Sequence, residues 1–297
     1  MKRTLLTITM LAGVLMLTGC YAPLFYGGGE VEEYTHHDIG DEPTPEATQQ
    51  GVEMTLSFDF GERTGIYAGE TKDGLPHGQG SFSSSNAEGL RWVYEGSWVE
   101  GHMEGQGTTT FETGYKETGW YERDSLNGEG ATYWDDKLQY EGEFAANAPD
   151  GQGKLYSLCG ELIFAGHFSE GYIDETQDAR RERLSDFRER CVQAAYSDME
   201  QSAAEGGDVR TVISGRVLYV FESDFPYQSS FLVECEGGDI CVSYHLSVGE
   251  DTVAAGESIT VWGIADDEFT YETDAGTEES MPMIEAWDVR NVSGTAL

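Results

Sequence analysis

Hydrophobic and polar positions alternate along most of the chain, with an apolar start and one helical region as exceptions. Between residues 65 and 173 the alternation predicts β-strands. Tyr94, Gly96 and Trp98, for example, share one face of a strand. A glycine-rich turn follows at 101–107, and a second strand returns through 108–111. Because one hairpin is only marginally stable, we expect such units to stack into a continuous antiparallel sheet.

The hairpin pattern occurs five times, starting at residues 67, 94, 117, 140 and 164. The third copy has Glu117 in place of the leading aromatic residue, the first has Thr71 in place of the second one, and the fifth is shortened. We expect the aromatic residues to face the core, although a single-layer sheet could leave one row open for binding. The motif positions are Tyr67, Gly69, Gly78, Gly80, Tyr94, Gly96, Trp98, Gly105, Gly107, Gly119, Tyr121, Gly128, Gly130, Tyr140, Gly142, Phe144, Gly151 and Gly153.

This pattern, Y-x-G-x-W-x-x-G-x-x-x-G-x-G, resembles the MORN repeat (membrane occupation and recognition nexus). The resemblance implies an elongated, twisted sheet of hairpins over residues 56–173. It also implies scaffolding, contact with proteins or dimerisation, and a contested role in lipid binding. The acidic charge of this segment argues against attraction to anionic headgroups.

The first residues predict export. Lys2 and Arg3 precede an apolar run that is too short to span a bilayer comfortably and is typical of a signal peptide. The run ends in Leu-Thr-Gly-Cys at 17–20, which resembles the lipobox of bacterial lipoproteins. The resemblance implies cleavage between Gly19 and Cys20, and a Cys20 thiol that carries diacylglycerol. With added acyl chains such as palmitate, this anchor would be stable. The alternative is an ordinary signal peptide with a chance cysteine.

Residues 20–55 predict a flexible acidic tether, because they combine glycine, proline and repelling carboxylates. His36 and His37 lie in it, where solvation is a simpler interpretation than metal binding.

A helical period marks residues 174–208. No glycine or proline occurs from Thr176 to Ala204, which predicts an amphipathic helix, or two. The arginines at its start fit a solvated face of a helix that caps the repeat sheet, or alternatively a dock for an acidic partner. The apolar positions that recur at three- and four-residue steps are Leu184, Phe187, Cys191, Ala195 and Met199.

Residues 209–297 predict five strands, with a bend at Gly215 in the first. This arrangement is similar to an OB-fold barrel, a fold that often binds oligonucleotides or oligosaccharides. Asp266, Asp267 and Glu268 form an acidic loop in this prediction, and a hard-cation site is the alternative. Five aromatic residues could stack on sugars, although packing within the barrel is the simpler expectation: Phe231, Tyr244, Trp262, Phe269 and Tyr271.

Charge and cysteine content exclude some classes of binding site. The net charge is −38, and acids outnumber bases in every segment after residue 20, which excludes a phosphate-binding nucleic-acid surface. Cys235 and Cys241 flank a predicted hairpin turn, so a cross-strand disulfide is predicted in an oxidising compartment. Their spacing does not suggest zinc.

The sequence shows no catalytic motif, so we expect no enzymatic activity, no cofactor and no metal. Together the patterns predict an extracytoplasmic, membrane-anchored envelope lipoprotein that scaffolds or binds an unknown protein. The alternative is a protein that binds carbohydrate or another envelope polymer through exposed aromatic residues. Exposed aromatic rows would favour carbohydrate, and packed rows would favour scaffolding.

Overall fold

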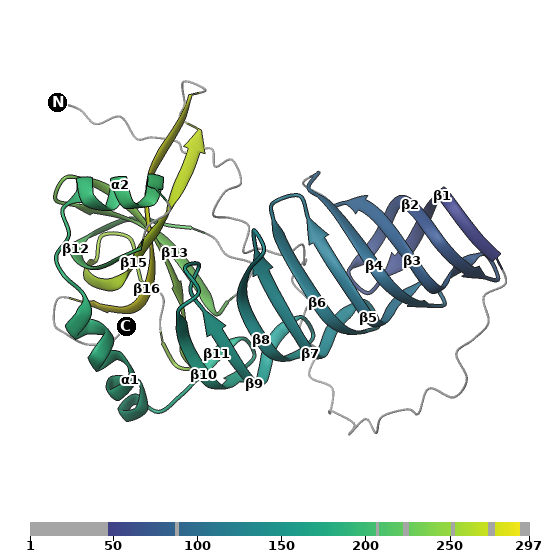
Figure 1. The fold of residues 1–297 in the computed structure, drawn as a ribbon, viewed down its shortest axis with the longest axis horizontal. Helices are drawn as coiled ribbons and strands as arrows, with labels where there is room; N and C mark the ends of the chain where they lie inside the picture. The colour runs from purple at the N-terminus through teal and green to yellow at the C-terminus, as the bar shows by residue number, and fades with distance from the viewer. Residues whose placement is uncertain are drawn as a thin grey trace. The chain divides into compact units, whose positions relative to one another are not determined.

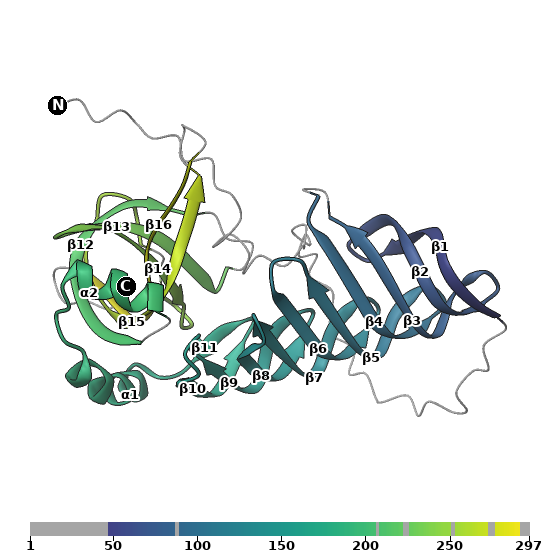
Figure 2. The ribbon, with the colours of Figure 1, turned by 45° about the horizontal axis from the view of Figure 1, so that its top comes forward.

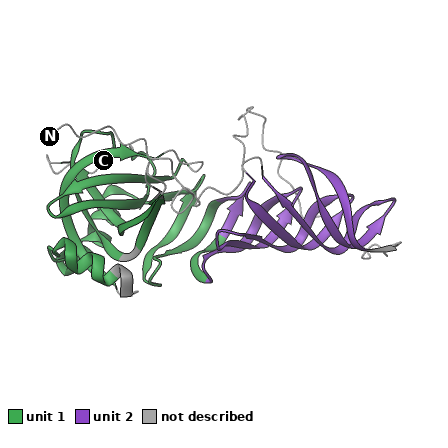
Figure 3. Cartoon of the chain, turned by 90° about the horizontal axis from the view of Figure 1, so that it is seen from above, with its two compact units in different colours: residues 1–19, 137–142, 149–297 green, residues 20–136, 143–148 purple. Residues whose placement is uncertain are grey.

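The computed structural model describes residues 47–86, 89–205, 208–221, 226–250, 253–272 and 277–291. The predicted signal peptide, Gly19, Cys20, both tether histidines and the tether up to residue 46 lie outside these ranges. The chain divides into two compact units, one of residues 20–136 and 143–148 and the other of residues 1–19, 137–142 and 149–297 (Figure 3).

Eleven strands form the repeat sheet, in which neighbours in sequence are also neighbours in space (Figure 1). Each repeat contributes an antiparallel hairpin, as the alternation predicts. The strands are β1 (Ala47–Phe58), β2 (Gly61–Lys72), β3 (Leu75–Ser85), β4 (Arg91–Val99), β5 (His102–Phe111), β6 (Tyr115–Glu122), β7 (Ser125–Trp134), β8 (Lys137–Ala145), β9 (Ala148–Tyr156), β10 (Leu162–Ser169) and β11 (Tyr172–Asp174).

The sheet begins earlier than the sequence predicts. We expected a tether through residue 55, whereas β1 starts at Ala47 and pairs with β2 from Ala47 opposite Thr71 to Phe58 opposite Gly61. Strand β1 carries one charge, Glu53, and buries Leu56 and Phe58. The alternating apolar residues of β1 therefore indicate a strand, although the residues before it have the composition of a tether.

The hairpin turns between β2 and β11 explain three of the glycines. In six two-residue turns there, both central residues have positive φ, a geometry that matches the twist of the flanking strands. Gly101 (φ 91°) and Asn147 (φ 70°) occupy the second position, as predicted, and Asp124 (φ 71°) takes it in the third repeat. The turns are Asp73–Gly74, Glu100–Gly101, Arg123–Asp124, Asp135–Asp136, Ala146–Asn147 and Glu170–Gly171.

Two helices follow the repeats, α1 (Gln177–Arg190) and α2 (Tyr196–Glu205). Thr176 caps α1 by accepting a hydrogen bond from the Ala179 N–H at 3.2 Å. The helices are separate because Val192 pairs with Thr211 in an isolated parallel bridge, which holds the link between them extended.

No helix among the described residues is both long and apolar enough to cross a membrane.

The last five strands close into a barrel in the order β12-β13-β14-β16-β15, with β14 and β16 parallel. Figure 2 shows α2 across the opening of this barrel. The predicted five-stranded, OB-like barrel is confirmed. Its strands are β12 (Val209–Val220), β13 (Gln228–Cys235), β14 (Gly238–His245), β15 (Ser258–Glu272) and β16 (Glu278–Asn291).

Gly215 is the point at which β12 changes partners. Residues before it pair with β15, and residues after it pair with β13. A Cβ at this position would lie 2.4 Å from the Glu234 carbonyl oxygen, so glycine permits the predicted bend. Within the barrel, Phe231, Val233 and Ile240 pack with Met199 of α2.

Candidate functional site

The aromatic residues of the repeats form the core of the sheet. Tyr94 packs edge-on against Trp98 and Tyr121, with ring centroids 5.1 and 5.0 Å away. The relative exposure of all these residues is 7% or less, so the packed arrangement is confirmed. The buried set is Tyr67, Tyr94, Trp98, Tyr121, Tyr140, Phe144, Phe164 and Phe168.

The motif glycines make room for these rings. Gly96 lies opposite Gly107 across β4 and β5, and the Tyr94 ring covers the pair. A Cβ at Gly107 would lie 2.3 Å from the Tyr94 hydroxyl oxygen. That hydroxyl donates a hydrogen bond to the Ser97 carbonyl at 3.0 Å. Tyr67 over Gly80 and Tyr140 over Gly153 repeat the arrangement.

The third repeat replaces this tyrosine with a buried acid. Glu117 is 4% exposed and accepts a hydrogen bond from the Tyr121 hydroxyl at 3.1 Å. Thr109 Oγ1 lies 2.7 Å from that hydroxyl. Burial raises the pKa of Glu117 to about 7, and the hydroxyl groups offset the shift only in part.

The third repeat also departs from the motif at its turn, where Asp124 replaces glycine or asparagine and contacts distant parts of the sheet. The Asp124 carboxylate, which is fully buried, accepts hydrogen bonds from the Met103 N–H at 2.8 Å and the Asp59 N–H at 3.1 Å. His102 Nδ1 lies 2.7 Å from the same carboxylate. Burial raises the pKa of Asp124, and these hydrogen bonds oppose the shift.

The ligand atoms of Asp59, His102 and Asp124 lie within 4.8 Å of one another, so they could also hold a cation. The hydrogen bonds already engage both carboxylate oxygens of Asp124. We therefore interpret the group as a set of hydrogen bonds that connects the turn at Asp124 to Asp59 and His102.

Neighbouring turns are linked in the same way along the sheet. The Arg123 N–H donates to Glu104 Oε2 at 3.1 Å, and the Ala146 N–H donates to Asn127 Oδ1 at 3.0 Å. His77 fills the equivalent position in the first repeat, where its Nδ1 accepts from a turn N–H at 3.4 Å. These contacts hold successive repeats in register.

The opposite side of strands β2–β7 carries short and mostly uncharged side chains in its middle, with acids such as Glu70 and Glu129 beside them. We call it the outer face. Three rows of cross-strand neighbours define it. The first is Ala68, Ser81, Glu95, Thr108, Thr118 and Ala131; the second is Ile66, Ser83, Val93, Thr110, Lys116 and Tyr133; the third consists of the pairs Gln79–Ser97 and Gln106–Trp120. Among these residues, Trp120 is the largest side chain, and it is 39% exposed.

The solvated face that we expected for the arginines of α1 holds for Arg181 and Arg190, which are exposed, and not for Arg180 and Arg188. Arg180 is 4% exposed and pairs with Glu250, and its Nη2 lies 3.4 Å from Asp288. Arg188 donates to Asp288 at 2.6 Å. These acids lie more than sixty residues away in sequence, so a helical period could not reveal them. The pairs also engage these arginines within the chain, against the alternative of a dock for an acidic partner.

Arg183 is the residue of α1 that contacts the repeat hairpins. It donates to the Ile163 carbonyl at 3.1 Å and lies over the Phe164 ring. Helix α2 instead packs on the barrel through Met199.

The predicted disulfide is wrong. Cys235 and Cys241 are free thiols, as is Cys191. Cys235 lies opposite Gly238 and packs toward the barrel interior, whereas Cys241 lies opposite Leu232 in a separate cluster. Because alternate residues point to opposite faces of a strand, the two thiols are on different sides of the hairpin.

Two predictions for the barrel have different outcomes. Asp266, Asp267 and Glu268 belong to strand β15 rather than to a loop, because β15 and β16 pair well beyond the barrel. The expected packing of aromatic residues is confirmed for Phe231, Tyr244 and Phe269, which are at most 5% exposed; Trp262 and Tyr271 are half-buried.

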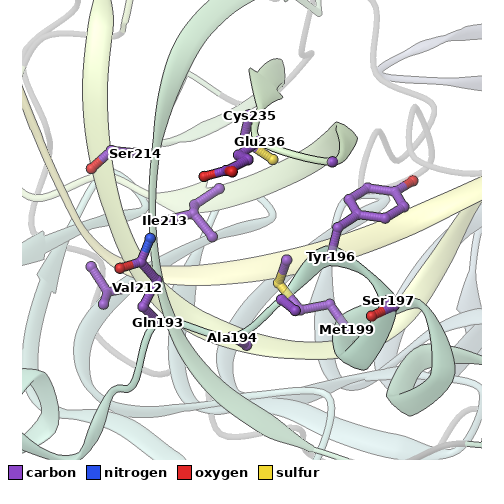
Figure 4. Close-up of a pocket in the computed structure, with 12 residues that line it drawn as sticks. Gln193, Ala194, Tyr196, Ser197, Met199, Val212, Ile213, Ser214, Cys235 and Glu236 are labelled. Carbon is purple, nitrogen blue, oxygen red and sulfur yellow. The ribbon is translucent and has the colours of Figure 1, made fainter.

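A cavity of about 590 Å³ opens between α2 and the start of the barrel (Figure 4). Tyr196, Met199, Ile213 and Cys235 line it, together with Glu236 at the hairpin turn. Burial raises the pKa of Cys235, so its thiol is not activated as a nucleophile.

The MORN-repeat family model matches three segments of the chain, residues 67–86, 94–114 and 140–157. These are the first, second and fourth copies. The third copy, which carries Glu117, Trp120 and Asp124, lies outside the matched segments, although it forms the same hairpin. No curated protein matches the chain.

Proposed function

We propose that the chain is a non-enzymatic, lipid-anchored envelope protein of a bacterium, and that it scaffolds or binds a protein partner through its repeat sheet. MORN repeats suggest a binding or scaffold role. The burial of the aromatic rows favours this role, because it leaves a face of short side chains for contact.

The ion pairs of the carboxyl-terminal unit support a rigid scaffold. Asp288 pairs with Arg180, Arg188 and Arg290, and Glu250 pairs with Arg180. Arg180 and Arg188 come from α1, whereas Asp288 and Arg290 come from β16. The ion pairs therefore connect α1 to the barrel. The barrel and helix together offer a second rigid surface for protein contact.

The sequence Leu-Thr-Gly-Cys at 17–20 supports the membrane anchor, and the charge of −38 supports display away from anionic headgroups. The anchor predicts that Cys20 incorporates a fatty-acid label. Cys20→Ser should lose the label and membrane association and should keep the native circular dichroism spectrum. Cys159→Ser is the matched control and should retain both. Equal labelling of the Cys20 variant and the native protein would contradict the proposal.

Binding of an envelope carbohydrate is the second candidate. The aromatic rows give it no support because they are packed. One specific observation favours it, namely the exposed indole of Trp120 on the outer face.

A further inference from the structure

The outer face has the chemistry of a surface for a neutral polymer. Glu95 and Lys116 are the charged residues among those that define it, and Lys116 lies over the Tyr133 ring and pairs with Asp136. Hydroxyl side chains dominate the remainder, as in the bond between Thr108 and Thr118 at 2.9 Å. Acidic side chains adjoin these rows, since Glu70 Oε2 accepts a hydrogen bond from the Gln79 N–H at 2.8 Å and Glu129 is exposed on β7 beside Trp120.

The third row contains an aromatic platform and two amides. Trp120 lies directly opposite Gln106, and Gln79 lies opposite Ser97, to which it donates a hydrogen bond at 2.8 Å. Gln79 and Gln106 are both exposed, and among the described residues Gln106 has no hydrogen-bond partner for its amide. A planar amide offers two donors and one acceptor, which suits sugar hydroxyls.

The space beside Trp120 is open. Gly128 is its neighbour on β7, with φ 78°, and a Cβ built there would approach only the Trp120 Cβ, at 3.9 Å. Trp120 is 39% exposed, so part of its indole is available for stacking beside Gly128 and Glu129. Aromatic faces provide a large contact area at low entropic cost.

The spacing of the row matches an extended glycan. Gln79 is on β3 and Gln106 is on β5, so their strands are two steps, or about 9.6 Å, apart. One strand step is close to the length of one sugar unit in an extended β-1,4-linked chain. A glycan that crosses the strands would therefore place alternate units over the amides and one unit over Trp120.

We propose that the row formed by Gln79, Ser97, Gln106 and Trp120 binds a neutral, extended β-1,4-linked polysaccharide. This site goes beyond the proposed contact with a protein. The acidic charge of the chain disfavours an anionic polymer, and the exposed carboxylate of Glu129 on β7 can accept hydrogen bonds from sugar hydroxyls at the edge of the row.

Affinity electrophoresis of the full-length protein tests this site, with hydroxyethylcellulose in the gel as the neutral β-1,4-linked polymer. Alginate, an anionic polymer, and soluble starch, a coiled α-linked polymer, are the comparison gels. We expect retardation by hydroxyethylcellulose alone, with little change at high salt because the ligand is uncharged. Absence of retardation by hydroxyethylcellulose, or equal retardation in all three gels, would overturn the proposal.

Variants locate the site. Trp120→Ala should weaken binding at least tenfold, and Trp120→Phe should restore most of it because a ring remains. Gln106→Ala should weaken binding severalfold. Tyr219→Ala is the matched control, since Tyr219 is 51% exposed on the barrel and should be dispensable. Native circular dichroism excludes unfolding. Unchanged binding by Trp120→Ala would refute the site, whereas the lipid-anchor and protein-contact proposals have separate tests.

Discussion

Glu117 makes the stability of the repeat sheet depend on pH. An ordinary glutamate has a pKa of 4.5, and burial raises the pKa of Glu117 to about 7. The difference of about 2.5 units corresponds to about 3.4 kcal/mol, at 1.36 kcal/mol per unit. The unfolded chain releases this proton at lower pH than the folded chain does. The contribution to stability is therefore complete below about pH 4.5 and is lost as pH rises through about 7.

Glu117→Gln removes the titration and keeps the size of the side chain. We expect the free energy of unfolding of the variant to exceed that of the native protein by about 2–3 kcal/mol at about pH 8, with a much smaller difference near pH 5. Urea unfolding of the purified chain, followed by tryptophan fluorescence across this range, measures the difference.

The comparison needs a control because other groups titrate in the same range. Burial lowers the pKa of His245 to about 4, which gives the barrel the opposite pH dependence. Glu129→Gln removes the same charge from an exposed position of the third repeat. Its difference from the native protein should be small and nearly independent of pH. A Glu117→Gln difference that stays constant from about pH 5 to 8 would refute the reasoning.

Three further outcomes follow from the packing. Gly107→Ala should destabilise the sheet by about 1–3 kcal/mol in urea unfolding, because its Cβ would collide with the Tyr94 ring. Arg180→Ala should cost about 3–5 kcal/mol of unfolding free energy, because it leaves the buried Glu250 carboxylate without its arginine, whereas Asp288 keeps Arg188 and Arg290; a loss below about 1 kcal/mol would contradict the assigned pairs. Alkylation of the denatured, unreduced protein followed by mass spectrometry should modify both Cys235 and Cys241, and a mass that indicates a bond between them would contradict the structure.

The repeats are the part of the fold that sequence predicts best, because each hairpin is specified locally. The alternation of Tyr94, Gly96 and Trp98 defines a strand face, and Gly101 defines a turn. Strand β1 was missed in part because its pairing partner, β2, supplies the reason for its structure.

Long-range contacts explain the other differences between the sequence predictions and the structure. Arg180 lies four residues before Leu184 and shares the buried face of α1, and its charge is compensated by Glu250 and Asp288, which are distant in sequence. The positions of Cys235 and Cys241 on opposite strands suggested a bond, whereas the register of the hairpin separates them. A shift by one residue changes the face on which a side chain lies, so the register of the hairpin decides whether two cysteines can meet.

The candidate surface was only partly visible in the sequence. Trp120 lies between the glycine and the second aromatic residue of the third repeat, so alternation places it on the outer side. Its closeness to Gln106 and to Gly128 depends on strand pairing and on backbone conformation, which only the structure provides.

Site-specific photocrosslinking in intact cells tests the scaffold proposal most directly. The crosslinking side chain would replace Val93, which is on the outer face, and Leu218, which is exposed on the barrel, in separate experiments. If the sheet presents the main protein contact, the chain with the crosslinker at 93 forms a discrete protein adduct, and the chain with it at 218 forms little or none. A chain that reaches the membrane but forms no protein adduct from position 93 would contradict the account.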